Sequence, residues 1–181
     1  APLALPHEKI IITNSKKIRS SVDERYHERR AQCEQALKEL QTVIAIRDLG
    51  ELTAEVFEKV QEMIGSPVRL RRARHAVTEN QRTIQAVEAL KRGDIFEFGQ
   101  LMNASHLSLK EDYEVSCEEL DILVEEAWNI DGVLGSRMMG AGFGGCTVSI
   151  VKNGAVNEFI SRVGQNYEKR TGLHAEFYVV E

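Results

Sequence analysis

The sequence contains few cysteines and prolines, three of each among 181 residues. The cysteines are Cys33, Cys117 and Cys146, an odd number without a C-x-x-C pair, so neither a disulfide framework nor a zinc site is expected. Free cysteines are typical of a reducing compartment, and we therefore expect a cytoplasmic protein. No stretch approaches the ~20 consecutive apolar residues of a membrane helix, so we expect no membrane partner.

The sequence also lacks a concentrated positive charge. Its formal net charge is −5, and acidic and basic residues are interspersed along the chain. A nucleic-acid surface needs clustered basic residues, so no nucleic-acid partner is expected. The densest basic run, residues 69–74, is interpreted as a solvated or interdomain helix face.

What is present is an ordinary globular composition, with 43% hydrophobic and 28% charged residues. This length is enough for one sizeable core, so residues 1–181 are predicted to form a single domain. The first residues, Ala1 to Pro6, contain no initiator Met and lead almost directly into a predicted strand. We therefore expect a chain cut from a longer one.

Apolar periodicity and end signals divide the chain into strands and helices. Predicted strands occupy residues 8–14, 133–138, 146–151 and 175–180. Predicted helices occupy residues 23–40, 53–64, 66–93, 94–109, 116–128 and 156–171. The order predicts an α+β fold, a mostly antiparallel four-stranded sheet with helices on one face. The nearest named topology is ferredoxin-like, with a helical insertion after the first strand.

Three helix starts carry specific signals. Ser66 before Pro67 predicts a serine N-cap, and Asp94 and Ser116 are each followed three residues later by glutamate, which predicts two capping boxes. The helix after Ser66 is expected to carry its apolar residues on one face. These residues are Ala73, Val77, Ile84, Val87 and Leu90.

The glycine-rich segment Gly140-Ala141-Gly142-Phe143-Gly144-Gly145 matches G-x-G-x-x-G, a weak signal by itself. A dinucleotide site requires a helix after the loop, whereas a strand is predicted there. A protein-kinase loop requires Val where Thr147 stands, and HRD and DFG elements are missing. A tight turn that uses glycine for positive φ is one interpretation. Close approach of the backbone to a ligand or another domain is favoured.

Residues 135–151, GSRMMGAGFGGCTVSIV, closely resemble the third signature motif of the galactokinases, a family of the GHMP kinase superfamily. Residues 25–34, 71–83, 101–121 and 172–181 also resemble galactokinase segments in order and spacing, so the resemblance covers nearly the whole chain. It implies a GHMP-kinase C-terminal domain. One departure is Met139, where the family usually carries threonine, and a hydroxyl is lost there.

The resemblance implies the function of an ATP-dependent galactokinase, which converts D-galactose and ATP to galactose 1-phosphate and ADP. The family's phosphate loop, metal ligands and catalytic aspartate belong to an N-terminal half that this sequence does not contain. We therefore expect no catalytic residue and no metal ligand on this chain, and ATP and Mg²⁺ bound mainly by that half. The N-terminal kinase domain is the expected partner. The isolated chain is expected to be inactive and to self-associate.

By resemblance, Tyr26 matches the tyrosine that contacts galactose. The alternative is a half-buried core tyrosine, because Tyr26 shares a helical stripe with Cys33 and Leu37. By resemblance too, four glycines match the loop that closes the active site, Gly140, Gly142, Gly144 and Gly145. His75 and His106 fall inside predicted helices and are interpreted as hydrogen-bonded structural residues.

Two other functions share this resemblance. One is a non-catalytic regulator that senses galactose and ATP, and the other is a kinase for a related sugar such as N-acetylgalactosamine. The residues that distinguish them lie in the N-terminal half, so this chain does not decide between them.

Overall fold

The computed structural model describes residues 5–18 and 21–180. The strands are β1 Glu8–Asn14, β2 Val133–Met138, β3 Cys146–Lys152 and β4 Glu176–Val180. The α-helices are α1 Val22–Leu40, α2 Ala54–Val60, α3 Pro67–Lys91, α4 Ile95–Glu111, α5 Glu118–Trp128 and α6 Val156–Thr171. Short 3₁₀ turns cover Leu49–Glu51, Gln61–Met63 and Asn153–Ala155.

The four strands form one antiparallel sheet in the order β2-β3-β1-β4. With α5 and α6 as the crossover helices, the chain follows the β-α-β-β-α-β pattern of a ferredoxin-like fold. Helices α1 to α4 form an insertion within this pattern, between β1 and α5. The predicted α+β class, four-stranded antiparallel sheet and helical insertion are confirmed.

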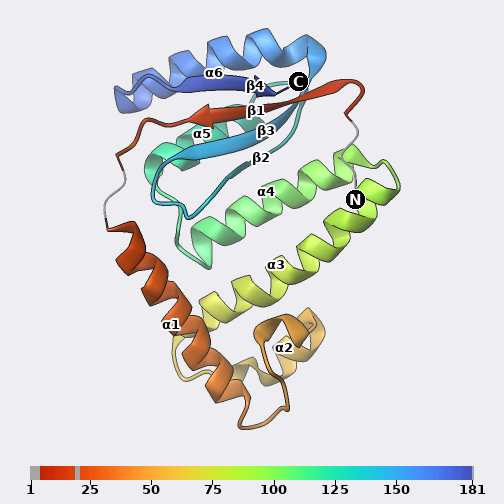
Figure 1. The fold of residues 1–181 in the computed structure, drawn as a ribbon, viewed down its shortest axis with the longest axis vertical. Coiled ribbons are helices and arrows are strands. Elements are labelled where there is room, and N and C mark those ends of the chain that lie inside the picture. The colour runs from red at the N-terminus through yellow and green to blue at the C-terminus, as the bar shows by residue number, and fades with distance from the viewer. Residues whose placement is uncertain (1–4, 19–20, 181) are drawn as a thin grey trace.

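One face of the sheet packs against α5 and α6 and forms the main core (Figure 1). Ile11 of β1 and Val151 of β3 point into this core and are fully buried. Because side chains alternate along a strand, Ile10 and Ile12 point to the opposite face. Tyr178 and Val180 of β4 pair with these residues and are 49% and 43% exposed. The second face is therefore apolar and only partly covered.

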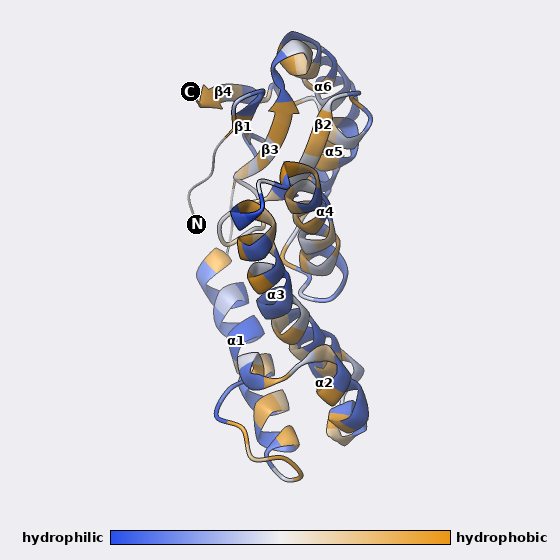
Figure 2. Cartoon of the chain, turned by 90° about the vertical axis from the view of Figure 1, so that its right-hand side faces the viewer, coloured by the Kyte–Doolittle hydropathy of each residue, from blue (hydrophilic) through white to orange (hydrophobic). Residues whose placement is uncertain are grey.

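The insertion extends away from the sheet, with α1, α2 and the first half of α3 around a second core (Figure 2). This core contains Leu40, Phe57, Ala73 and Val77. The predicted apolar face of α3 is correct for Ala73 and Val77 and wrong for Ile84, which is 58% exposed. The second half of α3 lies beyond this core and runs beside α4. The predicted apolar face of α3 therefore no longer packs against the second core there.

Two helix starts follow the predicted capping chemistry. The Ser66 hydroxyl accepts a hydrogen bond from the main-chain N–H of Arg69, and Pro67 opens the helix. Asp94 Oδ1 accepts the N–H of Glu97 at 2.9 Å. The Asp94 capping box is only half formed, because the Glu97 carboxylate pairs with Arg92 instead.

The capping box predicted at Ser116 is wrong. Helix α5 begins at Glu118 with Cys117 at the N-cap position, and the Ser116 hydroxyl donates a 2.6 Å hydrogen bond to Asp121. Asp121 lies one turn into the helix and also accepts a hydrogen bond from His106 Nε2, 3.3 Å away. The Asp121 carboxylate, five residues after Ser116 and also bound by His106 of α4, thus takes the serine hydroxyl that the capping pattern predicts for the main chain.

Helix α4 closes the β2 edge of the sheet with its side chains. Asn103 Oδ1 accepts the N–H of Ser136 at 2.8 Å and the Nε1–H of Trp128 at 2.7 Å. His106 Nδ1 accepts the N–H of Met138 at 3.2 Å. These bonds fix the strand that leads into the glycine-rich segment. Among the described residues, no helix is both long and apolar enough to cross a bilayer.

Candidate functional site

The glycine-rich segment forms the loop between β2 and β3, and its glycines adopt left-handed backbone conformations. Gly140, Gly142, Gly144 and Gly145 have φ values of 75°, 83°, 123° and 87°. Phe143 between them is also left-handed, with φ of 57°. Residues other than glycine adopt such φ angles only at an energetic cost, so the main-chain conformation of this loop requires the glycines. The structure thus confirms the turn chemistry, while a ligand role for the four glycines stays a prediction.

The loop is anchored through Phe143. Its ring is only 6% exposed and packs with Val115, Leu120 and Met138. Its main-chain N–H donates a 2.7 Å hydrogen bond to the carbonyl oxygen of Val115. The guanidinium of Arg25 lies 4.9 Å from the centre of the Phe143 ring, a cation–π distance. The loop is therefore held in place by the segment before α5 and by the first turn of α1.

Tyr26 directly follows Arg25 on α1, so the predicted sugar residue lies near the glycine loop. Its side chain is 49% exposed, and its ring touches the edge of His27. Cys33 and Leu37 join the helical core, whereas Tyr26 lies outside it. An exposure of 49% also fits the half-buried tyrosine of the alternative, so it does not decide between the two interpretations. Contact with galactose stays a prediction.

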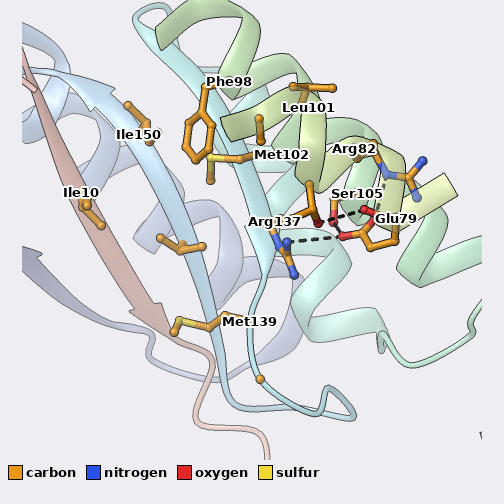
Figure 3. Close-up of a pocket in the computed structure, with 14 residues that line it drawn as sticks. Ile10, Glu79, Arg82, Phe98, Leu101, Met102, Ser105, Arg137, Met139 and Ile150 are labelled. Carbon is orange, nitrogen blue, oxygen red and sulfur yellow. Dashed lines mark hydrogen bonds and ion pairs between the residues drawn. The ribbon is translucent and has the colours of Figure 1, made fainter. Parts of the chain in front are cut away.

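A cavity of about 320 Å³ adjoins the loop (Figure 3). Ile10, Val148 and Ile150 line it from the open sheet face, and Phe98 and Met102 line it from α4. Met139 and Gly140 also line the cavity at the start of the glycine loop, and Met139 is 36% exposed. The thioether at position 139 thus occupies cavity wall where the family usually carries a hydroxyl.

The polar end of the cavity is a carboxylate between two guanidinium groups (Figure 3). Glu79 accepts hydrogen bonds from Arg82 Nε at 2.7 Å and from the Ser105 hydroxyl, and Arg137 Nη1 lies 3.6 Å from it. Burial alone would raise the pKa of Glu79, but the bonds from Ser105 and Arg82 outweigh it and lower the pKa. Burial lowers the pKa of Arg137. One carboxylate and two guanidinium groups leave a net positive charge beside the loop.

The two helix histidines are hydrogen-bonded structural residues, as predicted. His75 Nδ1 lies 2.8 Å from the Ser108 hydroxyl oxygen, and its ring stacks on Tyr113 with centroids 4.5 Å apart. Burial lowers the pKa of His75 to about 4, so the ring is neutral near neutral pH. His106 binds the β2 backbone as described above. Both bonds tie helices to neighbouring elements, and neither ring lines the cavity.

Sequence reasoning missed the charged groups of the site. Arg72 belongs to the basic run predicted to be solvated or interdomain, yet it is 2% exposed and donates to the carbonyl oxygen of Asp112. Arg29 and Arg137 likewise gave no local signal, because the groups they bind in the site are distant in sequence. Glu79 pairs with Arg82 one turn away, but its contacts with Ser105 and Arg137 also join distant segments. Within the ranges the structure describes, no group of three or more His, Cys, Asp or Glu side chains could hold a metal ion.

Comparisons with known proteins identify relatives of the chain as a whole. Residues 86–169 match the family described as GHMP kinases C terminal. The chain is 52% identical over 181 residues to a galactokinase of Levilactobacillus brevis, covering all of this chain and 47% of the relative. It is 55% identical over 172 residues to a galactokinase of Clostridium acetobutylicum, covering 95% of this chain and 44% of that protein. The chain thus spans about half the length of the curated relatives it matches.

Solved structures give the same result. The galactokinase of Lactococcus lactis complexed with galactose superimposes with a TM-score of 0.95 at 47% identity, over 98% of this chain and 46% of that one. A mevalonate kinase of L. major in complex with R-mevalonate aligns with a TM-score of 0.64 at 21% identity, over 100% of this chain and 45% of that one. The second likeness concerns the fold alone.

Proposed function

Since this chain belongs to the galactokinases of the GHMP kinase family and spans their C-terminal half, we propose that its parent protein transfers a phosphoryl group from ATP to D-galactose. The products are galactose 1-phosphate and ADP. The observation that carries the proposal is the likeness to the galactose-complexed Lactococcus lactis structure over 98% of this chain. The glycine loop, which galactokinases share, stands at the same end of the molecule as the exposed Tyr26.

Tyr26 is proposed to hydrogen-bond galactose. Its hydroxyl has no hydrogen-bond partner within the described part of the chain, and the side chain is half exposed. A phenol group offers one donor and one acceptor, which suits a sugar hydroxyl. Arg25, one position earlier, packs on Phe143 and keeps this end of α1 beside the glycine loop.

The glycine loop is proposed to border the transferring phosphoryl group. Without Cβ atoms, its main chain allows close approach, and N–H groups in such turns bind phosphate oxygens. When bound, ATP supplies the phosphoryl group and Mg²⁺ neutralises charge on it. By the resemblance to galactokinases, we assign the Mg²⁺ ligands to the N-terminal half.

The N-terminal half is also the proposed partner of the open sheet face. Ile12, Tyr178 and Val180 share this face, and the two residues of β4 are 49% and 43% exposed. An apolar sheet face is ordinarily covered by another layer.

Cys33, Cys117 and Cys146 are free, which supports a reducing cytoplasm for the parent protein.

A chimera tests the proposal. This chain would replace the matching 47% of the Levilactobacillus brevis galactokinase, and ADP release would be measured with galactose and Mg-ATP. We expect phosphorylation of galactose by the chimera and none by the 181-residue chain alone. A folded chimera that consumes no ATP with galactose would contradict the proposed function. Turnover by the isolated chain would contradict the proposed dependence on the N-terminal half.

A further inference from the structure

The segment between α4 and α5, Asp112–Val115, binds three separate parts of the molecule through four consecutive carbonyl oxygens. Arg29 of α1 takes two of them, because its Nε donates to Tyr113 O at 2.8 Å and its Nη2 donates to Glu114 O at 3.1 Å. We call Asp112–Val115 the connector. A planar guanidinium spanning two successive carbonyl groups fixes both their distance and their direction.

The other two carbonyl oxygens of the connector face α3 and the glycine loop. Arg72 Nη1 donates to Asp112 O at 2.6 Å, and Phe143 N–H donates to Val115 O at 2.7 Å. The side chains of Arg29 and Arg72 are only 12% and 3% exposed. Their bonds to carbonyl oxygens are therefore charge-assisted, and those to Tyr113 O and Asp112 O are partly buried.

The connector adopts a conformation that needs these bonds. Glu114 has φ of 53°, a left-handed angle that is costly for a residue with a side chain. Its carboxylate pairs with Arg71 and Arg72 of α3. Arg29 of α1 thus binds the carbonyl oxygen of Glu114, and two arginines of α3 bind its carboxylate. The carbonyl oxygen of the next residue, Val115, binds Phe143 of the glycine loop.

We propose that Arg29 is a positioning residue for phosphoryl transfer, acting through the connector to hold the glycine loop in register with Tyr26. Tyr26 and Arg29 are three residues apart on α1 and so lie on one side of the helix. One face of α1 thus carries both the proposed sugar contact and the group that fixes the loop. This inference rests on the proposed function. The position of the glycine loop relative to Tyr26 affects catalysis only if a phosphoryl group at the loop is transferred to a sugar bound at Tyr26.

Arg30 provides the matched control. It follows Arg29 on the same helix, but its side chain is 67% exposed and pairs with Glu34 one turn away. Replacing either arginine removes the same charge from α1. Only the Arg29 replacement removes donors from the connector.

The kinetic test uses the chimera described above, with Arg29→Ala, Arg29→Lys and Arg30→Ala. For Arg29→Ala we expect kcat to fall by roughly 10- to 100-fold, the cost of slightly misplaced reacting groups, while KM for galactose changes less than about threefold. Arg29→Lys keeps the charge but cannot span both carbonyl groups, so we expect a smaller loss. Arg30→Ala should match the unsubstituted chimera.

A second measurement reports on the loop itself. Amide hydrogen exchange of residues 140–145 in the chimera should quicken about tenfold or more in Arg29→Ala and stay unchanged in Arg30→Ala. If the chimera proves inactive, the proposed function fails, whereas the exchange result still decides whether Arg29 positions the loop. Arg29→Lys provides the same comparison if Arg29→Ala does not fold. Equal kcat and equal loop exchange in the Arg29 and Arg30 variants would overturn the inference.

Discussion

Gly142 lies directly against the carbonyl oxygen of Val115, so a Cβ atom at position 142 would overlap that oxygen. The same residue has φ of 83°, which L side chains rarely adopt. Two independent constraints thus require glycine at one position, one from the turn and one from the connector beside it. The packing of the loop on the connector depends on the absence of this side chain.

Gly142→Ala should lower the free energy of unfolding by about 2 kcal/mol or more, because backbone strain and overlap with Val115 add together. Urea denaturation of the 181-residue chain measures this. Gly154→Ala is the control, since a Cβ atom at Gly154 meets nothing within 4 Å. It should change the stability by less than about 0.5 kcal/mol. Equal effects of the two substitutions would show that the close approach at Gly142 is unimportant.

Tyr26→Phe should weaken galactose use by ~1–2 kcal/mol, the range for one lost hydrogen bond, while the ring keeps its place. That range corresponds to an increase of roughly 5- to 30-fold in KM for galactose, measured in the chimera. Since the side chain lies outside the core, the melting temperature should hardly change. An unaltered KM with a lowered melting temperature would instead favour a structural role for Tyr26.

His75 should make the fold sensitive to mild acid. Its pKa is lowered to about 4 by burial, so between an unfolded value near 6.5 and that value the unfolded chain binds more protons. Stability is therefore lost as pH falls through this window. Between pH 7 and pH 5 the loss should be about 2 kcal/mol.

His75→Gln removes the titrating group and keeps a polar contact for Ser108. Urea unfolding of both proteins at pH 7 and pH 5 measures the difference. The pKa values of Glu79 and Asp121 are also lowered, but those carboxylates release their stabilisation mainly below pH 5. An equally steep pH dependence in His75→Gln would exclude His75 as the cause.

The isolated chain should self-associate through its open sheet face. Tyr178 and Val180 are exposed there, next to Ile10 and Ile12 of β1. Light scattering across a concentration series should show mass increasing with concentration, and Tyr178→Lys with Val180→Lys should reduce it. Ile84→Lys, at a more exposed apolar site on α3, should leave association unchanged. A monomer at every concentration would count against this face as an interface.

Local signals predicted most of the fold because they depend on neighbours in sequence. The serine before Pro67 and the aspartate before Ile95 cap their helices as expected, and the β-branched run of β1 forms a central strand. Ser116 shows where such reasoning ends. Its capping pattern is as good as that of Asp94, but the hydroxyl binds the Asp121 carboxylate five residues later, which His106 of α4 holds in place from a distant part of the chain.

The candidate site likewise has features that local sequence predicts and features that only the folded chain creates. The need for positive φ at the four loop glycines can be read from the sequence, whereas the partner that requires Gly142 is 27 residues earlier and leaves no local trace. The basic run at residues 69–74 predicts a solvated or interdomain face for Arg72, because runs of basic residues usually lie on such faces. Only the folded chain brings Asp112 and Gln32 to its guanidinium.

The side chains of α4 that bind β2 give the sheet two unequal edges. Asn103 and His106 already occupy the N–H groups of Ser136 and Met138, so a strand from another molecule finds these β2 donors taken. Strand addition is therefore directed to β4, the other edge in the order β2-β3-β1-β4. An assembly that joins two such molecules β4 to β4 consumes the available edge of each, so it closes as a symmetric pair instead of growing into a fibre.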